Sequence, residues 1–262
     1  MPEGHTIHRL ARDHTEWFGG QKLAISSPQG RFADEATLID GKVLDRASAC
    51  GKHLFYHFKR APILHIHLGL YGKYRIHDDP PPEPRGAVRV RMIGESMTAD
   101  LNGPNQCEVI DEDEFGSILS RLGPDPLRED ANPDRAWCKI NKSRAPIGQL
   151  LMDQSVVAGI GNIYRTEILW RAKIHPKASG NTISASQFDE IWKDAVELMR
   201  LGVKHNKIIT VDPKSAGKPP SKLGVRERTN IYKKTKCPRC ASKIEQFTLA
   251  GRKVFACVRC QE

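Results

Sequence analysis

The chain has 262 residues, of which 39% are hydrophobic and 27% are charged, and its formal net charge is +10. This length suits one large domain, or two domains with an accessory module. No apolar run approaches the ~20 residues of a membrane span, and the amino terminus lacks the charged-then-apolar pattern of a secretory signal. We therefore expect a soluble cytoplasmic protein without a membrane partner.

The positive charge is concentrated in the last quarter of the chain. From Arg200 onward there are sixteen Lys/Arg against four Asp/Glu, whereas the first 199 residues hold 25 basic and 27 acidic residues. A basic region of this kind is typical of a protein that binds a polyanion, most often nucleic acid. A solvated basic surface without a partner is the alternative that charge alone leaves open.

The first half of the chain predicts one helix followed by short strands. Apolar residues recur at helical spacing until Gly19-Gly20 ends the pattern; they are Ile7, Leu10, Ala11, Trp17 and Phe18. Turn residues then separate runs rich in strand formers, at 22–26, 41–44, 53–58, 63–68, 71–77, 87–92 and 96–101. The proline-rich stretch 78–84 predicts a stiff loop. Short strands at this spacing predict a sandwich or barrel.

The second half of the chain predicts helices. Residues 122–126, Leu-Gly-Pro-Asp-Pro, separate the halves, and short helices are expected at 147–152 and 162–171. Ser184 and Gln187 form a capping-box pattern that opens an amphipathic helix closed by Gly202. Residues 204–230 are basic, rich in Pro, Gly and Ser and weakly patterned, so we interpret them as a mobile connector or a substrate-facing loop.

The first four residues, Met1-Pro2-Glu3-Gly4, are a candidate active site. Methionine before proline is expected to be removed, which leaves the Pro2 nitrogen as an amine with a pKa near 8. Part of that amine is unprotonated at neutral pH and free to attack an electrophilic carbon. Glu3 is placed to move protons beside it. Taken alone, the same letters are also simply a common way for a protein to begin.

Four of the seven cysteines form a metal-binding pattern. Cys237-x-x-Cys240 and Cys257-x-x-Cys260 are two knuckles sixteen residues apart, which favours one structural Zn²⁺ held by four thiolates over two disulfides or a redox pair. The segment 242–256 between them predicts a β-hairpin with Arg252 near its tip. Arg252 is either a phosphate ligand or an exposed turn residue. Cys50, Cys107 and Cys138 are scattered, and we expect them to be small buried or half-buried side chains.

Two weaker patterns point to phosphate. Gly159-Ile160-Gly161 allows close backbone approach before Asn162 opens a helix, and amides at a helix start bind phosphate. Lys52 stands between Gly51 and a strand. Such a lysine is commonly a surface residue, but in a cleft it becomes a phosphate ligand or a proton donor.

Together these pieces resemble the formamidopyrimidine-DNA glycosylase/endonuclease VIII family of base-excision repair enzymes over nearly the whole chain. The start, Met-Pro-Glu-Gly, is similar to the endonuclease VIII branch, and residues 49–54 resemble the family's lysine motif. Residues 150–164, running on to 174–176, resemble its helix–two-turn–helix signature, and the cysteine-bearing tail resembles its zinc finger.

The resemblance implies three catalytic roles. Pro2 is expected to attack C1′ of the damaged nucleotide, expel the base and form a Schiff base. Glu3 is expected to handle protons during base loss and ring opening. Lys52 is expected to contact phosphate and assist strand cleavage by β- and δ-elimination.

The resemblance also implies how DNA is held. Asn162 and Arg252 are expected to grip the phosphates that flank the lesion, with DNA lying between the two larger parts of the molecule. The target base must leave the stack, and the apolar pair Leu70 and Tyr71 is expected to fill the gap.

Two departures from the family pattern bear on the substrate. The purine-specific branch carries an Arg-Arg-Phe-Gly loop, and the corresponding region here, 103–108, has neither the arginines nor the phenylalanine. Pro-Glu-Gly also replaces the Pro-Glu-Leu-Pro-Glu of that branch. The first departure bears on discrimination of the opposite base and on the residues that fill the void. The second favours oxidised pyrimidines over formamidopyrimidines and 8-oxoguanine.

The resulting hypothesis is a bifunctional DNA glycosylase/AP lyase that acts as a monomer on damaged double-stranded DNA, with single-stranded or abasic DNA as further substrates. We expect an α+β multidomain fold: an N-terminal helix with an antiparallel β-sandwich at 1–121, a helical helix–two-turn–helix domain at 122–230, and a Cys₄ hairpin zinc finger at 231–262. The alternatives are a catalytically silent DNA-binding protein and an abasic-site lyase with little base excision.

Overall fold

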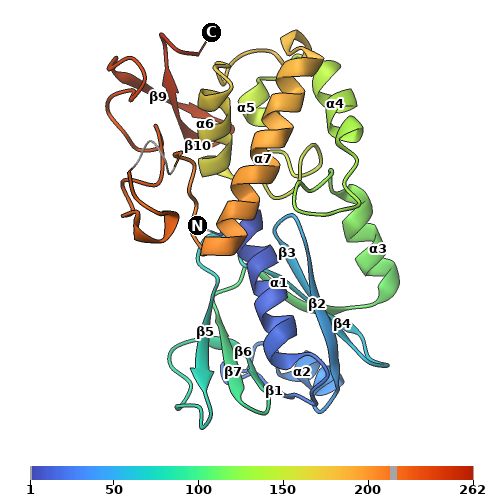
Figure 1. Cartoon of the computed structure of the whole chain (residues 1–262). Coiled ribbons are helices and arrows are strands. Elements are labelled where there is room, and N and C mark those ends of the chain that lie inside the picture. Colours follow the sequence, from blue (N-terminus) through green and yellow to red (C-terminus); the bar gives the residue numbers. More distant parts are fainter. Residues whose placement is uncertain (1, 213–216, 262) are drawn as a thin grey trace. The chain divides into compact units, whose positions relative to one another are not determined.

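The computed structural model describes residues 2–212 and 217–261 and divides into two compact units, Met1–Arg121 and Leu122–Glu262 (Figure 1). The expected removal of Met1, and the part of the predicted connector at 213–216, lie outside the described residues. Among the helices of the described chain, none is long and apolar enough to cross a membrane.

The first unit is a helix packed on an antiparallel β-sandwich, as predicted. Its two four-stranded sheets have the strand orders β1-β6-β7-β5 and β2-β3-β4-β8, and residues from both sheets share one hydrophobic core. Its elements are α1 (Gly4–Phe18), β1 (Ala24–Ser26), α2 (Ala33–Ile39), β2 (Leu44–Cys50), β3 (His53–Phe58), β4 (Ile63–His67), β5 (Lys73–Asp78), β6 (Val88–Ile93), β7 (Met97–Asn102), β8 (Gln106–Ile110) and α3 (Glu112–Arg121).

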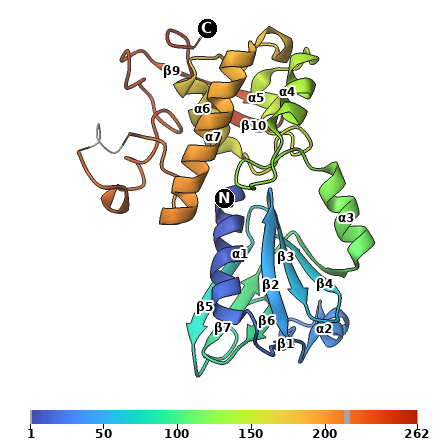
Figure 2. The same cartoon turned by 45° about the vertical axis from the view of Figure 1, so that its right-hand side comes forward.

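Helix α1 lies along strand β2 (Figure 2). Ile7 and Phe18 are fully buried in the core, as the helical spacing of apolar residues predicts. The hydroxyl of Thr15 accepts a hydrogen bond from the backbone nitrogen of Ala47 at 2.8 Å and donates to the Ala47 carbonyl at 3.1 Å. A side chain of the helix thus pairs with strand backbone, which fixes α1, and the residues that precede it, on the sheet.

Several predicted boundaries in this unit are wrong. The strand expected at 41–44 is instead β2, which begins at Leu44 and has a register shift between Leu44 and Arg46. Its small and charged residues do not resemble a strand, because its buried positions are filled largely by alanine. Helices α2 and α3 and strand β8 carry short or acidic sequences and were not expected.

The second unit is helical and ends in a hairpin, again as predicted. Its elements are α4 (Pro133–Asn141), α5 (Ile147–Leu150), α6 (Asn162–Arg171), the 3₁₀ turns η1 (Gly180–Thr182) and η2 (Pro220–Lys222), α7 (Ala185–His205), β9 (Ile244–Leu249) and β10 (Arg252–Cys257). Helix α4 was not expected, and Cys138 on it is exposed rather than buried. The antiparallel pair β9–β10 turns through Ala250 and Gly251, both with positive φ, as a two-residue hairpin requires.

The capping box at the start of α7 is confirmed, because the Ser184 side chain and the Gln187 side chain each bond the other's backbone nitrogen. The predicted end at Gly202 is wrong. Gly202 is buried within the helix, which continues to His205 and ends at Asn206 in the left-handed conformation, with φ 52°. Asparagine tolerates that conformation nearly as readily as glycine does, so the stop signal lies one turn later than the glycine.

Candidate functional site

The amino-terminal residues of the first unit lie at the start of α1. Glu3 is the N-cap residue, with extended backbone, and its carbonyl accepts a hydrogen bond from the Thr6 nitrogen at 2.9 Å. Glu3 is 1% exposed and Pro2 is half-buried. A carboxyl group at this position lies in the favourable field of the helix amino terminus. Burial lowers the pKa of the neighbouring His5 to about 4, so His5 is uncharged at neutral pH.

Lys52 occupies the tight turn between β2 and β3. Cys50 pairs with His53 across the turn, and Gly51 supplies the positive φ of 59° that the turn needs. Lys52 is half-buried. Beside it, the rings of His53 and His67 lie 5.0 Å apart, and the charge of Lys52 adds to burial in lowering the pKa of both.

These histidines were not identified from the sequence. The signal was present in the predicted strands 53–58 and 63–68, where alternation places His53, His65 and His67 on one face of the sheet. The group of ionisable side chains around Lys52 is therefore larger than a lone lysine.

Leu70 and Tyr71 project from a constrained turn in the first unit. Their side chains are 44% and 84% exposed, which is unusual for large apolar groups side by side. The turn is held by a 2.9 Å hydrogen bond from the Gly72 nitrogen to the Leu68 carbonyl. A Cβ on Gly72 would lie 2.3 Å from that carbonyl oxygen, so only glycine fits and the apolar pair is held outward.

The region 103–108 divides into a turn and a strand. Gly103 has φ 59°, and the Asn105 nitrogen bonds the His67 carbonyl at 2.8 Å. Gln106 onward belongs to β8. Only residues 103–105 are therefore loop. Such a short turn leaves little room for an extended loop that could insert into DNA.

In the second unit, Asn162 contacts the strand that carries Arg252. Asn162 begins α6 and is 6% exposed. Its amide nitrogen donates to the Lys253 carbonyl at 3.0 Å, and its side-chain oxygen accepts from Arg165. Arg252 is exposed at the first position of β10. The Asn162 side chain therefore fixes the start of α6 against the strand that carries Arg252.

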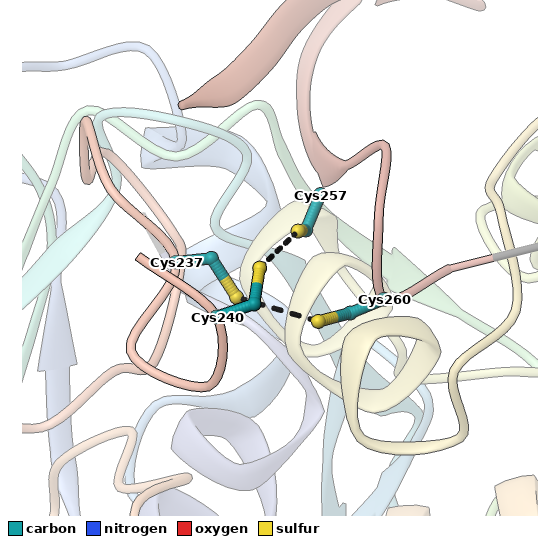
Figure 3. A group of neighbouring side chains, drawn as sticks. All are labelled: Cys237, Cys240, Cys257 and Cys260. Atoms are coloured by element: carbon teal, nitrogen blue, oxygen red, sulfur yellow. Dashed lines mark hydrogen bonds between the residues drawn. The ribbon is translucent and has the colours of Figure 1, made fainter. Parts of the chain in front are cut away.

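The four tail cysteines form one cluster (Figure 3). Their sulfur atoms all lie within 4.8 Å of one another. Two of the separations are 3.9 Å, from Cys237 to Cys260, and 3.4 Å, from Cys240 to Cys257. Thiolates bound to Zn²⁺ at about 2.3 Å in a tetrahedron are about 3.8 Å apart. The donor set therefore fits a metal ion such as zinc.

The hairpin is anchored to the rest of the second unit. The Gln261 side chain accepts from the Cys257 nitrogen at 2.8 Å and donates to the Ile174 carbonyl at 2.8 Å. On α6, the fully buried Glu167 accepts from several groups of the loop that leads into the hairpin. Its donors are the Thr210 hydroxyl and the backbone nitrogens of Asn230, Ile231 and Tyr232, at 2.6 to 2.8 Å. The described ends of the predicted connector 204–230 are thus firmly held.

Comparison with known proteins defines the family. Residues 1–117 match the formamidopyrimidine-DNA glycosylase N-terminal domain, and residues 122–213 match the formamidopyrimidine-DNA glycosylase H2TH domain. The chain is 51% identical over 267 residues to Endonuclease 8 1 of Mycobacterium tuberculosis, and 28% identical over 277 residues to the formamidopyrimidine-DNA glycosylase of Lactococcus lactis. Each alignment covers all of both chains.

Solved structures agree. The chain is similar to the Lactococcus lactis enzyme crystallised with DNA containing N7-benzyl-Fapy-dG, with a TM-score of 0.83, 26% identity and full coverage of both chains. A complex of that enzyme with abasic-site DNA gives the same TM-score and identity over 99% of each chain. The fold and matches define a base-excision DNA glycosylase with AP lyase activity. The chain belongs to the formamidopyrimidine-DNA glycosylase/endonuclease VIII family, with an endonuclease VIII relative among its strongest matches.

Proposed function

We propose that this glycosylase removes oxidised bases, pyrimidines in preference to purines, from damaged double-stranded DNA. The observation that carries the proposal is the full-length 51% identity to Endonuclease 8 1. It is supported by the Pro-Glu-Gly start and by a turn at Gly103 too short for an extended wedge loop. We expect the protein to act as a monomer in the cytoplasm, on the nucleoid.

The proposed chemistry begins at Pro2 once Met1 has been removed. The secondary amine attacks C1′ of the damaged nucleotide, the bond to the base breaks, and the base leaves with a proton. Ring opening then gives a Schiff base between Pro2 and the sugar. Glu3, buried at the start of α1, is the proposed proton donor and acceptor in these steps. Strand cleavage follows by β- and δ-elimination.

The proposed DNA contacts come from both units. Lys52 contacts phosphate and assists elimination, while Asn162 and Arg252 grip the phosphates beside the lesion. Leu70 and Tyr71 fill the space left by the flipped nucleotide, a use that explains why large apolar side chains are left in water.

The metal that the tail cysteines hold is proposed to be one structural Zn²⁺. Four thiolates fill its coordination sphere and leave no position for substrate. A hairpin as short as β9–β10 has little core of its own, so the metal supplies much of its folding free energy. We accordingly treat 231–262 as a zinc finger beyond the helical domain, 122–230.

A panel of duplexes, each with one defined lesion, tests the proposed function. Excision of oxidised pyrimidines at several times the rate for 8-oxoguanine would support it. Nicking of abasic DNA without release of any base would favour an abasic-site lyase, and binding without nicking would favour a DNA-binding protein. The same panel on single strands measures the strand preference.

A further inference from the structure

A hydrogen-bonded chain of three side chains crosses the sheet β2-β3-β4-β8. Glu108 on β8 bonds Nδ1 of His65 at 2.8 Å, and Nε2 of His65 bonds Nδ1 of His53 at 2.9 Å. Strand register explains the arrangement, because His65 pairs directly with Glu108 and is one diagonal step from His53. The chain runs from a half-exposed carboxylate to the residue that follows Lys52.

The chain lies on the face of the sheet that points away from the sandwich core. Leu54 and Leu64, the neighbours of these histidines in sequence, are buried in that core, so the alternating side chains point to the opposite face. There the ring of Phe55 stacks on His65, with centroids 4.9 Å apart, and meets Phe115 of α3 edge-on at 4.8 Å. His65 is 1% exposed. Aromatic packing therefore fixes its ring orientation.

The direction of the hydrogen bonds follows from their two ends. An ionised carboxylate only accepts, so the Nδ1 atom of His65 carries the proton. Burial lowers the pKa of His65, although the hydrogen bond to Glu108 opposes this, and a neutral imidazole must then accept at Nε2. Nδ1 of His53 is consequently the donor to His65. A neutral His53 is left with its lone pair at Nε2.

His53 is held neutral by its surroundings. Burial, the other histidines, and the positive charges of Arg121 and Lys52 lower its pKa to about 3. Its Nε2 atom is therefore a hydrogen-bond acceptor near Arg121 and Lys52, and His53 adds no positive charge that would repel Lys52. The two ends of this hydrogen-bonded chain are thus linked. The Glu108 carboxylate selects the tautomer of His65, and His53 is left with an uncharged acceptor at Nε2.

We propose that the Glu108–His65–His53 chain positions Lys52. By presenting an uncharged hydrogen-bond acceptor on the first residue of β3, directly after the turn that carries the lysine, it orients the ammonium group at the end of the sheet. Glu108, His65 and His53 are positioning residues, since none is placed against the reacting atoms. This inference rests on the proposed role of Lys52 in strand cleavage.

The test separates Lys52 chemistry from Pro2 chemistry in one experiment. A duplex with an abasic site is mixed with excess protein, and two products are followed: the borohydride-trapped Schiff base and the nicked strand. His65→Phe keeps an aromatic ring in the packed layer but breaks the chain. We expect it to trap at the wild-type rate, within about twofold, and to nick about tenfold more slowly, the effect of one lost hydrogen bond.

His57→Phe is the matched control. His57 lies on the same face of the same strand as His53, bonds only Ser48 among the interactions described for its ring nitrogens, and also packs on Phe115, at 5.3 Å. It should leave both rates unchanged. Glu108→Leu removes the acceptor for Nδ1 of His65 at a half-exposed position, where the fold should tolerate the change, and should slow nicking alone.

Nicking by His65→Phe and Glu108→Leu at the wild-type rate would overturn the inference. An equal loss of trapping and nicking would overturn it too, because it would indicate a general structural role. Absence of any trapped adduct with the wild-type chain would contradict the proposed function instead, so the two failures are distinguishable.

Discussion

The indole nitrogen of Trp170 donates a hydrogen bond to the sulfur of Cys237 across 3.4 Å. Trp170 lies on α6, yet it belongs to the hydrophobic cluster of the hairpin. The guanidinium of Arg239, between the first two cysteines, stacks 4.2 Å above the same indole. A helix of the helical domain thus supplies part of the core, and one hydrogen-bond donor, of the metal centre.

Substitution of Trp170 should therefore weaken binding of the metal by the four cysteines. Trp170→Phe keeps most of the packing but removes the donor to the thiolate, and loss of an outer-shell partner typically weakens metal binding 10–100-fold. We expect at least a severalfold faster release of zinc to a coloured chelator, followed by absorbance. Trp192→Phe, at a half-buried position on α7 that packs on Phe188, is the control and should release zinc at the wild-type rate. Equal rates for all proteins would show that the indole does not support the site.

Removal of a metal-binding cysteine should have a larger effect on the hairpin than substitution of Trp170. Cys237→Ser should lose the bound zinc and unfold the hairpin, because its short strands cannot hold together alone. Metal analysis and amide hydrogen exchange would show a zinc-free protein with loss of protection confined to the tail. Retained protection in β9 and β10 would mean that the hairpin folds without metal.

Arg252 is predicted to act through charge. Arg252→Ala should weaken binding to lesion-containing duplex about tenfold and reduce the slope of log K against log salt by about one phosphate contact. Arg259→Ala removes another exposed arginine, from the knuckle between Cys257 and Cys260, and comparison of the two separates a specific contact from net charge. The same loss for both variants would refute a special role for Arg252.

Acid should destabilise the first unit through its buried histidines. His14 is fully buried, and burial lowers its pKa to about 3. Below the ordinary value of 6.5 the unfolded chain binds a proton that the folded chain does not, so stability rises with pH between about 3 and 6.5. His14→Gln should reduce this slope by about 1.4 kcal/mol per pH unit.

Urea unfolding at several pH values measures the slope. At pH 8 the imidazole is neutral in both states, so the variant and the wild type there differ by the lost hydrogen bond to Tyr56 and the lost ring packing, not by a proton. If stability rises equally steeply with pH in His14→Gln and in the wild type between pH 3 and 6.5, His14 is not the group responsible.

The sequence predicted most of the fold because its periodic elements are long or well capped. Helix α1 has a regular apolar stripe, α7 has a capping box, and the cysteine spacing leaves few alternatives. The failures are short elements whose form depends on tertiary contacts. Strand β2 is held by Thr15 of α1 and by pairing with β3, neither of which is visible in its own residues.

Only part of the candidate site has a local signature in the sequence. Pro2, Glu3, Lys52 and Arg252 belong to local motifs that can be read directly from the chain. The supporting residues could not be found in this way, because Glu108 and His65 meet only through strand register. Glu167 likewise meets Thr210 and Asn230 only when the loop folds back on α6. Interactions between distant segments carry no local signature.

The central claim is that Pro2 is the nucleophile, and borohydride trapping tests it most directly. The mature chain, with Met1 removed as checked by intact mass, is incubated with lesion-containing duplex and borohydride, and the adduct is mapped by peptide mass. We predict one covalent adduct at Pro2, lost in Pro2→Gly and, for lesion substrates, strongly reduced in Glu3→Gln, which should still bind the DNA. An adduct at another residue, or one that Pro2→Gly forms unchanged, would contradict the account.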